Sequence, residues 1–294
     1  LRVPVILTSD GMPSEMNRML DQDKASARIE ILRDRVSNGH YFDVEACLRH
    51  IHNGTGDPYA CKAELQEYAW VSALLAWFTD GDLTVFKQWS FVSAKLLRTL
   101  YQERPNNYYM TSAHLSPLLS DNADLIDWFS RLEYPFAVKG GYSGPDLVAK
   151  PSTFEFHHYN TWLALRGDWG ALAARCRTFL DAIPARSRSY EADCRFMLSL
   201  AEGDLASMEA ALKVLVKPVT MKRRELEESG NSLSLICSVA VVYAKLAWYH
   251  GFHVRPDSPM IPEQWLPIAP IASYDDHFEF LAATDDHVPE PPAA

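Results

Sequence analysis

The chain has 294 residues, of which 48% are hydrophobic and 22% charged, and its formal net charge is −10. This length and composition suffice for one large globular domain or two smaller ones. The negative charge argues against nucleic acid as a direct partner, because phosphate binding requires clustered lysine and arginine, and it suits a protein partner with a basic surface.

Hydrophobic residues recur at helical spacing in the N-terminal part, and we find no convincing series of alternating strands. The pattern predicts five helices in this part: residues 13–37, 41–52, 58–79, 82–103 and 123–131. Asp57 and Asp82 fit the N-cap position, because a carboxylate accepts hydrogen bonds from the free N–H groups of the first helical turn.

Residues 132–152, LEYPFAVKGGYSGPDLVAKPS, are rich in glycine and proline and form the best candidate boundary. They separate an N-terminal helical part, residues 1–131, from a C-terminal helical-hairpin part, residues 153–294. A linker or functional loop and a packed connection inside one body fit this composition equally well. We expect the two parts to form one continuous globular unit.

The C-terminal part is more regular, with short connections between its helices. The predicted helices are residues 154–166, 168–182, 187–202, 204–216, 217–228 and 231–249. The proline-rich residues 253–270 cannot form one long helix, but a short helix can begin at Pro262, since proline is favoured at the first helical position.

The dipeptide Gly-Asp directly joins consecutive predicted helices at residues 81–82, 167–168 and 203–204. Glycine adopts the left-handed conformation that ends a helix, and aspartate then caps the next one. We therefore interpret Arg166-Gly167-Asp168 as such a junction rather than as an adhesion motif. The 36 residues from Gly167 to Gly203 are close to a tetratricopeptide-type repeat. The predicted fold is all-α: stacked antiparallel helical hairpins in an irregular, tetratricopeptide-like array with little or no β-structure.

The cysteines and the apolar stretches predict a cytoplasmic protein without membrane contact. The five cysteines contain no C-x-x-C pair, and most lie among apolar residues at helical spacing, as buried free thiols of a reducing compartment do. The most apolar stretch, residues 233–252, includes Lys245 and a histidine, so it is more typical of a buried helix than of a membrane span.

The common nucleotide-binding, zinc-protease and serine-hydrolase motifs are missing from the sequence. His157 and His158 are adjacent, so on a helix their rings point about 100° apart and would not converge on one ion. We expect packing or polar contacts for both, and helix capping for His250, which precedes Gly251. These patterns predict no catalytic residue, no metal site and no cofactor; an enzyme with a histidine–carboxylate metal site remains a minor alternative.

Two segments carry clustered charge. Lys217, Lys222, Arg223 and Arg224 precede three glutamates, a pattern typical of an exposed helix face whose charges offset each other. Near the C-terminus, Asp-Asp-His occurs at residues 275–277 and again at 285–287. A divalent-ion site, a solvated acidic end of the chain and a contact patch for a basic partner are the three interpretations of this repeat.

From Thr153 onward the sequence resembles the immunity protein 49 family of bacterial polymorphic-toxin systems. Three blocks carry the resemblance: LALRGDWGALAARCRTFLDAI, ADCRFMLSLAEGDLASMEAALKVL and AVVYAKLAWYHGFHVRPDSPMIPEQWL. The last block combines an apolar helix, a glycine break, an aspartate, Ser-Pro and a helix that begins with proline. The resemblance covers a little under half of the chain, and the first 150 residues contain no matching motif.

This resemblance implies a protein that binds a co-encoded toxin and neutralises it without catalysis, although it transfers no interface residue. The functional hypothesis is therefore a cytoplasmic immunity protein that occludes a toxin such as a nuclease or another effector acting inside the cell. A nuclease has a basic substrate groove, which would complement the net charge of −10. A helical-repeat adaptor for protein–protein contacts is the alternative. The candidate toxin-binding residues are Asp275, Asp276, Glu279, Asp285 and Asp286.

Overall fold

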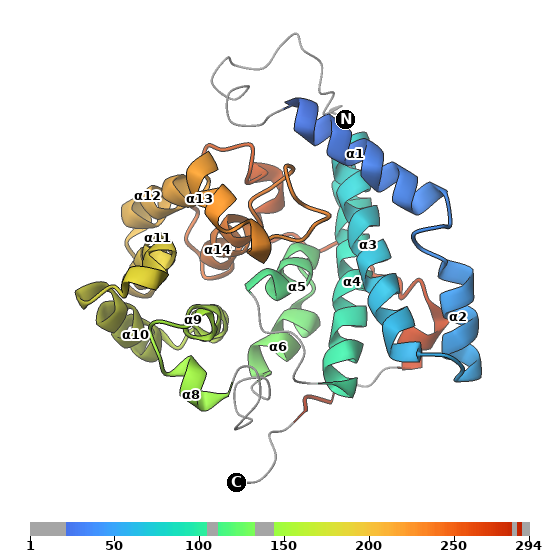
Figure 1. Ribbon diagram of the computed structural model, residues 1–294, viewed down its shortest axis with the longest axis horizontal. Helices are drawn as coiled ribbons and strands as arrows, with labels where there is room; N and C mark the ends of the chain where they lie inside the picture. Colours follow the sequence, from blue (N-terminus) through green and yellow to red (C-terminus); the bar gives the residue numbers. More distant parts are fainter. Residues whose placement is uncertain (1–21, 105–110, 133–143, 284–286, 290–294) are drawn as a thin grey trace. The chain divides into compact units, whose positions relative to one another are not determined.

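The computed structural model describes residues 22–104, 111–132, 144–283 and 287–289 (Figure 1). Over these residues it contains helices and loops and no strand, which confirms the predicted all-α fold class. The contacts divide the described chain into two compact units. Unit 1 comprises residues 22–104, 116–129, 269–283 and 287, and unit 2 comprises residues 111–115, 130–132, 144–268, 288 and 289.

Unit 1 is built on two long antiparallel helices, α3 (Pro58–Asp80) and α4 (Leu83–Glu103) (Figure 1). α1 (Gln22–Ser37) and α2 (Val44–Asn53) pack against α3. The unit also takes in most of α5 (Leu115–Ser120) and α6 (Ala123–Arg131), together with η6 (Glu279–Ala283).

A returning segment near the C-terminus belongs to the core of unit 1. Phe278 and Leu281 are buried in the same hydrophobic cluster as Leu65 of α3 and Val92 of α4. Nearby, the buried side chains of Lys87 and Asp121 form an ion pair at 2.7 Å, and both bond to the backbone of Ala269. The sequence-based division instead grouped this segment with residues 153–294. Hydrophobic periodicity locates helices along a chain, but it does not say which distant helix a returning segment packs against.

Unit 2 contains the helical hairpins. The first consists of α9 (Phe154–Arg166) and α10 (Trp169–Asp181), and the second of α11 (Glu191–Glu202) and α12 (Leu205–Leu215). α11 packs against α9, α10 and α12. The other helices of the unit are η2 (Thr111–His114), α8 (Pro145–Val148), η3 (Ala185–Tyr190), α13 (Pro218–Arg223), η4 (Glu225–Glu227), α14 (Ser238–Tyr249) and η5 (Glu263–Trp265).

The Gly-Asp junctions have the predicted geometry. Gly167 and Gly203 are left-handed, with φ of 72° and 74°, and end α9 and α11. Asp168 then accepts a hydrogen bond from the N–H of Ala171 at 3.3 Å, and Asp204 accepts one from the N–H of Ser207 at 3.1 Å. Each pair ends one helix and caps the next, so the interpretation of Arg166-Gly167-Asp168 as a helix junction is confirmed.

Two predicted helices in unit 2 were too long. The helix predicted over residues 217–228 ends at Arg223, and the one predicted over residues 231–249 begins at Ser238. The Glu228 carboxylate accepts hydrogen bonds from the N–H of Ser238 at 2.9 and 3.1 Å, and Ser234 is left-handed with a φ of 68°. A side-chain acceptor from outside the helix thus sets where α14 begins.

The burial of the cysteines and of Lys245 agrees with the sequence-based expectations. All five cysteines are free thiols, and four are buried. Lys245 is buried in α14, the most apolar helix. Its ammonium group is accommodated there because Nζ donates hydrogen bonds to the carbonyl oxygens of residues 265, 266 and 267 at 2.7, 3.1 and 3.0 Å. Among the helices of the described ranges, none has both the length and the apolar character needed to cross a bilayer.

Candidate protein-binding site

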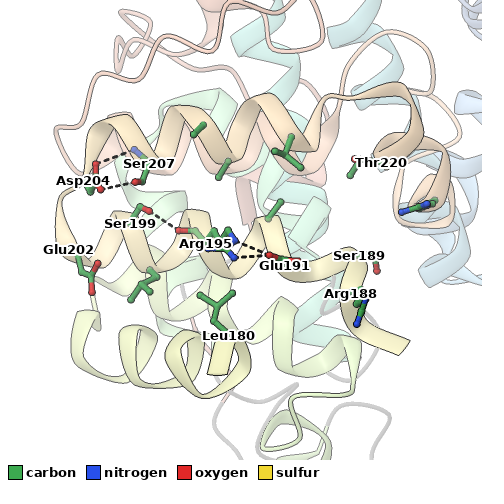
Figure 2. A pocket seen from close by; sticks show the side chains of 16 residues that line it. Leu180, Arg188, Ser189, Glu191, Arg195, Ser199, Glu202, Asp204, Ser207 and Thr220 are labelled. Atoms are coloured by element: carbon green, nitrogen blue, oxygen red, sulfur yellow. Dashed lines mark hydrogen bonds and ion pairs between the residues drawn. The ribbon is translucent and has the colours of Figure 1, made fainter. Parts of the chain in front are cut away.

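A groove of about 640 Å³ runs along α11 on the surface of unit 2, between α10 and α12 (Figure 2). We call it the α11 groove. It is lined by Leu180, Arg188, Ser189, Glu191, Ala192, Arg195, Leu198, Ser199, Glu202, Asp204, Ser207, Ala210, Ala211, Val214, Thr220 and Arg223. These residues come from α10, η3, α11, α12 and α13, so the groove depends on the packing of five consecutive elements.

Short side chains of both central helices contribute to the lining of the groove. On α11, Ala192 and Ser199 are seven residues apart and therefore share a face, and on α12 Ser207 and Ala211 do the same. Val214, which is 39% exposed, adds an apolar wall. The sequence analysis missed these residues. Their spacing was visible, but short side chains on a helix face equally indicate close packing against another helix.

The two ends of the groove have opposite charge (Figure 2). Glu202 and Asp204 lie at one end, and Arg188 lies at the other, the end at which Thr220 is also found. Hydrogen bonds from Ser207 lower the pKa of Asp204, so this carboxylate is charged near neutral pH. Between the ends, Glu191 and Arg195 form an exposed ion pair at 2.7 Å. A bound chain with complementary charges would therefore be oriented by the groove.

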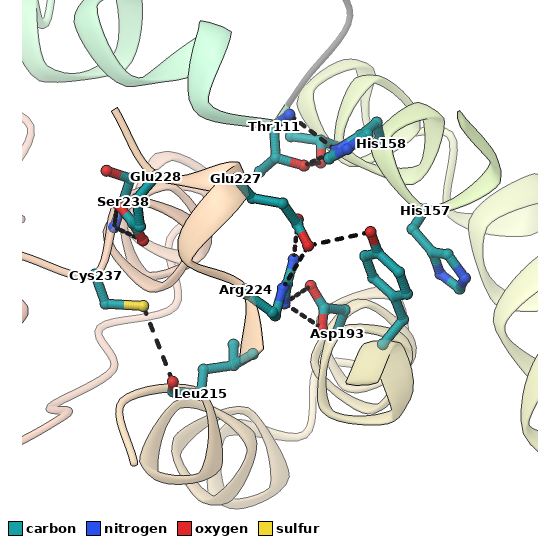
Figure 3. A network of polar contacts seen from close by, with 12 residues as sticks. Thr111, His157, His158, Asp193, Leu215, Arg224, Glu227, Glu228, Cys237 and Ser238 are labelled. Carbon is teal, nitrogen blue, oxygen red and sulfur yellow. Dashed lines mark hydrogen bonds and ion pairs between the residues drawn. The ribbon is translucent and has the colours of Figure 1, made fainter. Parts of the chain in front are cut away.

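A buried polar network supports the basic end (Figure 3). Arg224 donates to both carboxylate oxygens of Asp193 on α11 at 2.7 Å, and to both oxygens of Glu227 at 3.0 and 2.7 Å. Tyr243 of α14 donates to Asp193 at 2.7 Å, and Tyr190 donates to Glu227 at 3.1 Å. This network holds the end of α13 against α11 and α14. It therefore also positions Arg223, which precedes Arg224 and lines the groove.

The carboxylates around Arg224 keep its guanidinium group charged. Burial alone would lower the pKa of Arg224, but the carboxylates of Asp193 and Glu227 outweigh burial and raise the pKa. The sequence-based interpretation of Arg224 as part of an exposed helix face was therefore wrong, because this side chain is only 7% exposed. Arg223, its neighbour, is exposed and lines the α11 groove.

The two adjacent histidines contact different partners. The ring of His157 stacks on Tyr190 with centroids 4.0 Å apart, whereas Nδ1 of His158 accepts a hydrogen bond from the N–H of Thr111 at 3.0 Å. Burial lowers the pKa of His157 to about 4 and that of His158 to about 3, so both rings are neutral near pH 7. In the part of the chain that the structure describes, no group of three His, Cys, Asp or Glu residues could hold a metal ion.

A second hollow of about 400 Å³ adjoins the acidic end of the groove. It is lined by Trp169, Leu200, Ala201, Glu202, Gly203, His250 and Phe252, and we call it the Gly203 cleft. Glu202 lines both hollows. His250 forms the C-cap of α14, as predicted, and its Nε2 donates to the carbonyl oxygen of Ala164 at 2.7 Å. Burial lowers the pKa of His250.

Three of the five acidic residues predicted to bind a toxin, Asp275, Asp276 and Glu279, lie in unit 1, whereas both hollows lie in unit 2. Asp276 forms an ion pair with Lys95 at 2.5 Å. The carboxylate of Asp275 accepts a hydrogen bond from the N–H of His277 at 3.3 Å, and Glu279 is exposed on η6. Residues 285 and 286, the aspartates Asp285 and Asp286, lie outside the described residues.

No family model, curated protein or solved structure matches the chain. What the protein binds must therefore be inferred from the geometry of its own surface and from its sequence blocks.

Proposed function

We propose that the chain binds a segment of a partner protein in the α11 groove, and that this partner is a bacterial toxin which it neutralises by occlusion in the cytoplasm. The observation that carries the proposal is the form of the groove. The α11 groove has carboxylates at one end, a guanidinium group at the other, and the exposed ion pair of Glu191 and Arg195 between them. A polypeptide is the ligand class that matches both its length and its two charged ends.

The length follows from the helix that forms the floor. α11 has 12 residues, and at 1.5 Å per residue it is about 18 Å long. An extended chain rises roughly 3.3 Å per residue, so about five residues span the groove. An α-helix of about three turns would have the same length.

The toxin assignment is supported by the resemblance of three sequence blocks to immunity protein 49, and one of these blocks lies at the groove. The block ADCRFMLSLAEGDLASMEAALKVL forms α11 and α12, and the block LALRGDWGALAARCRTFLDAI forms the junction from α9 to α10. The block that forms α11 and α12 thus lines much of the groove, whereas the first block contributes Leu180 alone and the third block contributes no lining residue. A toxin bound there would be blocked by steric occlusion, which requires no catalytic group in this chain.

Co-expression in bacteria tests this proposal. The toxin-like product encoded next to this gene should arrest growth, and the wild-type chain should restore it. Ala210→Trp fills the groove from α12 and should abolish protection, whereas Lys213→Trp, on the same helix but outside the lining, should retain it. Circular dichroism and thermal melting establish that both variants fold. If Ala210→Trp protects as well as wild type, the groove is not the toxin-binding site. If growth is arrested despite the wild-type chain, that toxin is not its partner.

A helical-repeat adaptor is the second candidate, because hairpin arrays present grooves that bind short segments of several proteins. The two candidates differ in partner number and affinity. An immunity protein has one dominant partner, and toxin–inhibitor pairs reach the tightest known affinities. Isothermal titration calorimetry with the purified toxin distinguishes the two candidates, because an adaptor would bind the toxin no more tightly than it binds unrelated peptides.

A further inference from the structure

The C-terminal ends of three helices meet at the Gly203 cleft. α9 ends at Arg166, α11 at Glu202 and α14 at Tyr249. The hydrogen bond from His250 to the carbonyl oxygen of Ala164 joins the end of α14 to the last turn of α9. The ring of Phe252 lies beside Gly203, where an added Cβ would be 3.5 Å from the ring. These contacts hold the three ends together in unit 2.

Each of these ends is a source of negative potential. The aligned peptide dipoles of a helix place about half a negative charge at its C-terminus. α10 and α12 begin in the same region with the opposite partial charge, but Asp168 and Asp204 cap them with full negative charges. Together with the Glu202 carboxylate in the lining, the backbone and the caps make the cleft favourable for a cation.

The aromatic side chains of the cleft add to this preference. Trp169, His250 and Phe252 are each partly exposed, so their rings are accessible to a ligand. The faces of tryptophan and phenylalanine attract ammonium and guanidinium groups. His250 adds no positive charge near pH 7, because burial lowers its pKa and outweighs the hydrogen bond to Ala164, which raises it.

Two cations of the chain itself are close to this region. Arg177 pairs with Glu202 at 2.6 Å, but both side chains are about half exposed, at 57% and 46%. Exposed pairs of this kind contribute little stability and are readily exchanged for another partner. Arg166 instead donates to the hydroxyl of Tyr159 at 3.2 Å. An incoming basic side chain therefore competes with Arg177 for the carboxylate.

We infer that the Gly203 cleft binds a lysine or arginine side chain of the partner protein. This inference rests on the proposed role of the α11 groove and fixes the orientation of the bound segment. A basic residue of the segment occupies the cleft beside Glu202, and an acidic residue lies toward Arg188 and Arg223 at the other end.

The cleft is tested without the toxin, by NMR titration of the full chain. The probes are the blocked amides of arginine and lysine, with the amides of citrulline and norleucine as uncharged controls of similar shape. The indole N–H resonance of Trp169, assigned with Trp169→Phe, should shift with the two cationic amides alone, at concentrations up to tens of millimolar.

Variants then connect this binding to the lining residues. Glu202→Gln and Phe252→Leu should each weaken binding of the arginine amide about twofold to tenfold. Arg177→Gln, which removes the competing cation, should strengthen it. Glu225→Gln removes an exposed carboxylate of η4 outside the lining and should leave the Kd unchanged.

The inference is overturned if the cationic amides cause no shift, or if the uncharged amides cause an equal one. These outcomes are separate from those of the co-expression experiment. If the cationic amides bind but the wild-type chain gives no protection, the toxin assignment fails and the cation site stands. Conversely, if the wild-type chain protects but the amides do not bind, the groove remains the proposed toxin-binding site and the cleft is not part of the interface.

Discussion

Nη1 of Arg224 donates to both carboxylate oxygens of Asp193 at 2.7 Å, although the two residues are 31 positions apart and only 7% and 3% exposed. A buried pair of this kind is costly to break, because removal of one partner leaves the other charge without compensation in a medium of low dielectric constant. The pair connects α11, which forms the floor of the α11 groove, to the end of α13, which supplies Arg223 to its basic end.

The first prediction concerns this pair. Arg224→Gln should lower the free energy of unfolding by about 3–5 kcal/mol, because Asp193 stays buried without its cation. The neighbouring Arg223→Gln, at an exposed position, should change it by less than about 0.5 kcal/mol. Urea denaturation monitored by tryptophan fluorescence measures both. The triple variant Asp193→Leu/Arg224→Met/Glu227→Gln, which removes all three charges, should lose less than Arg224→Gln, and a larger loss would show that the charges are not the source of the effect.

His114 predicts a dependence of stability on pH. Its ring is fully buried against Trp162, with centroids 3.9 Å apart, and neither ring nitrogen has a hydrogen-bond partner within the described residues. Burial lowers its pKa from 6.5 to about 3. The folded state therefore holds His114 neutral while the unfolded state takes up a proton below pH 6.5. This contribution to stability is present above pH 6.5 and is lost as the pH falls toward 3.

His114→Phe removes this titration and the unpaired ring nitrogens. Relative to wild type, the variant should gain up to about 1.4 kcal/mol of unfolding free energy for each pH unit below 6.5. Urea denaturation at pH 7, 6 and 5 measures the difference. Trp162→Phe, which alters packing beside His114 but does not titrate, is the matched control and should show a difference independent of pH. A pH-independent difference for His114→Phe as well would contradict the prediction.

The sequence predicted the local structure around the groove because the relevant interactions are local. Gly203 ends α11 and Asp204 caps α12, and both effects depend on residues within one helical turn. The same reasoning failed for Arg224. Its nearest charges in the sequence are lysine, arginine and glutamate at helical spacing, which is typical of an exposed face, whereas its partner Asp193 comes from a different helix.

The groove itself was not predictable for a related reason. Ser199 and Ser207 are short residues on helix faces, and such faces either pack against another helix or remain open. The outcome depends on the segment that comes after α12. The chain there forms α13, which is only 6 residues long, and then turns into η4, so no full-length hairpin covers the face. The end of α13 is determined by tertiary contacts of Arg224 that a sequence pattern does not contain.

A pair of glycines tests the helix-junction interpretation with effects of opposite sign. Gly203→Ala places a Cβ on a residue with φ of 74°, where an alanine costs about 1–2 kcal/mol, although the space beside Phe252 would accept it. Gly170→Ala, in the first turn of α10 with nothing within 4 Å of the added Cβ, should stabilise by about 0.5–1 kcal/mol. Thermal unfolding measures both. Equal melting temperatures for the two variants would refute this account of the junctions.

We predict that the acidic segment of unit 1 and the groove of unit 2 affect different rate constants of toxin binding. Neutralising Asp275, Asp276, Glu279, Asp285 and Asp286 together changes the net charge from −10 to −5. If this patch steers a basic toxin, the association rate constant should fall about tenfold or more at low salt, with a weaker salt dependence, while the dissociation rate constant is nearly unchanged. Ala210→Trp in the groove should instead raise the dissociation rate constant, because it removes contacts of the docked complex.

The control for the patch replaces five exposed acids of α1, α2 and α3, namely Asp23, Glu30, Asp34, Glu45 and Glu67, and gives the same net charge. Surface plasmon resonance over a series of salt concentrations compares the two sets. If both sets slow association equally, net charge rather than the patch attracts the toxin. Unchanged association for the patch variant would remove these five residues from the interface. Because Asp276 is paired with Lys95, the thermal stability of the patch variant must be measured alongside its binding, since a partly unfolded unit 1 would mimic a loss of steering.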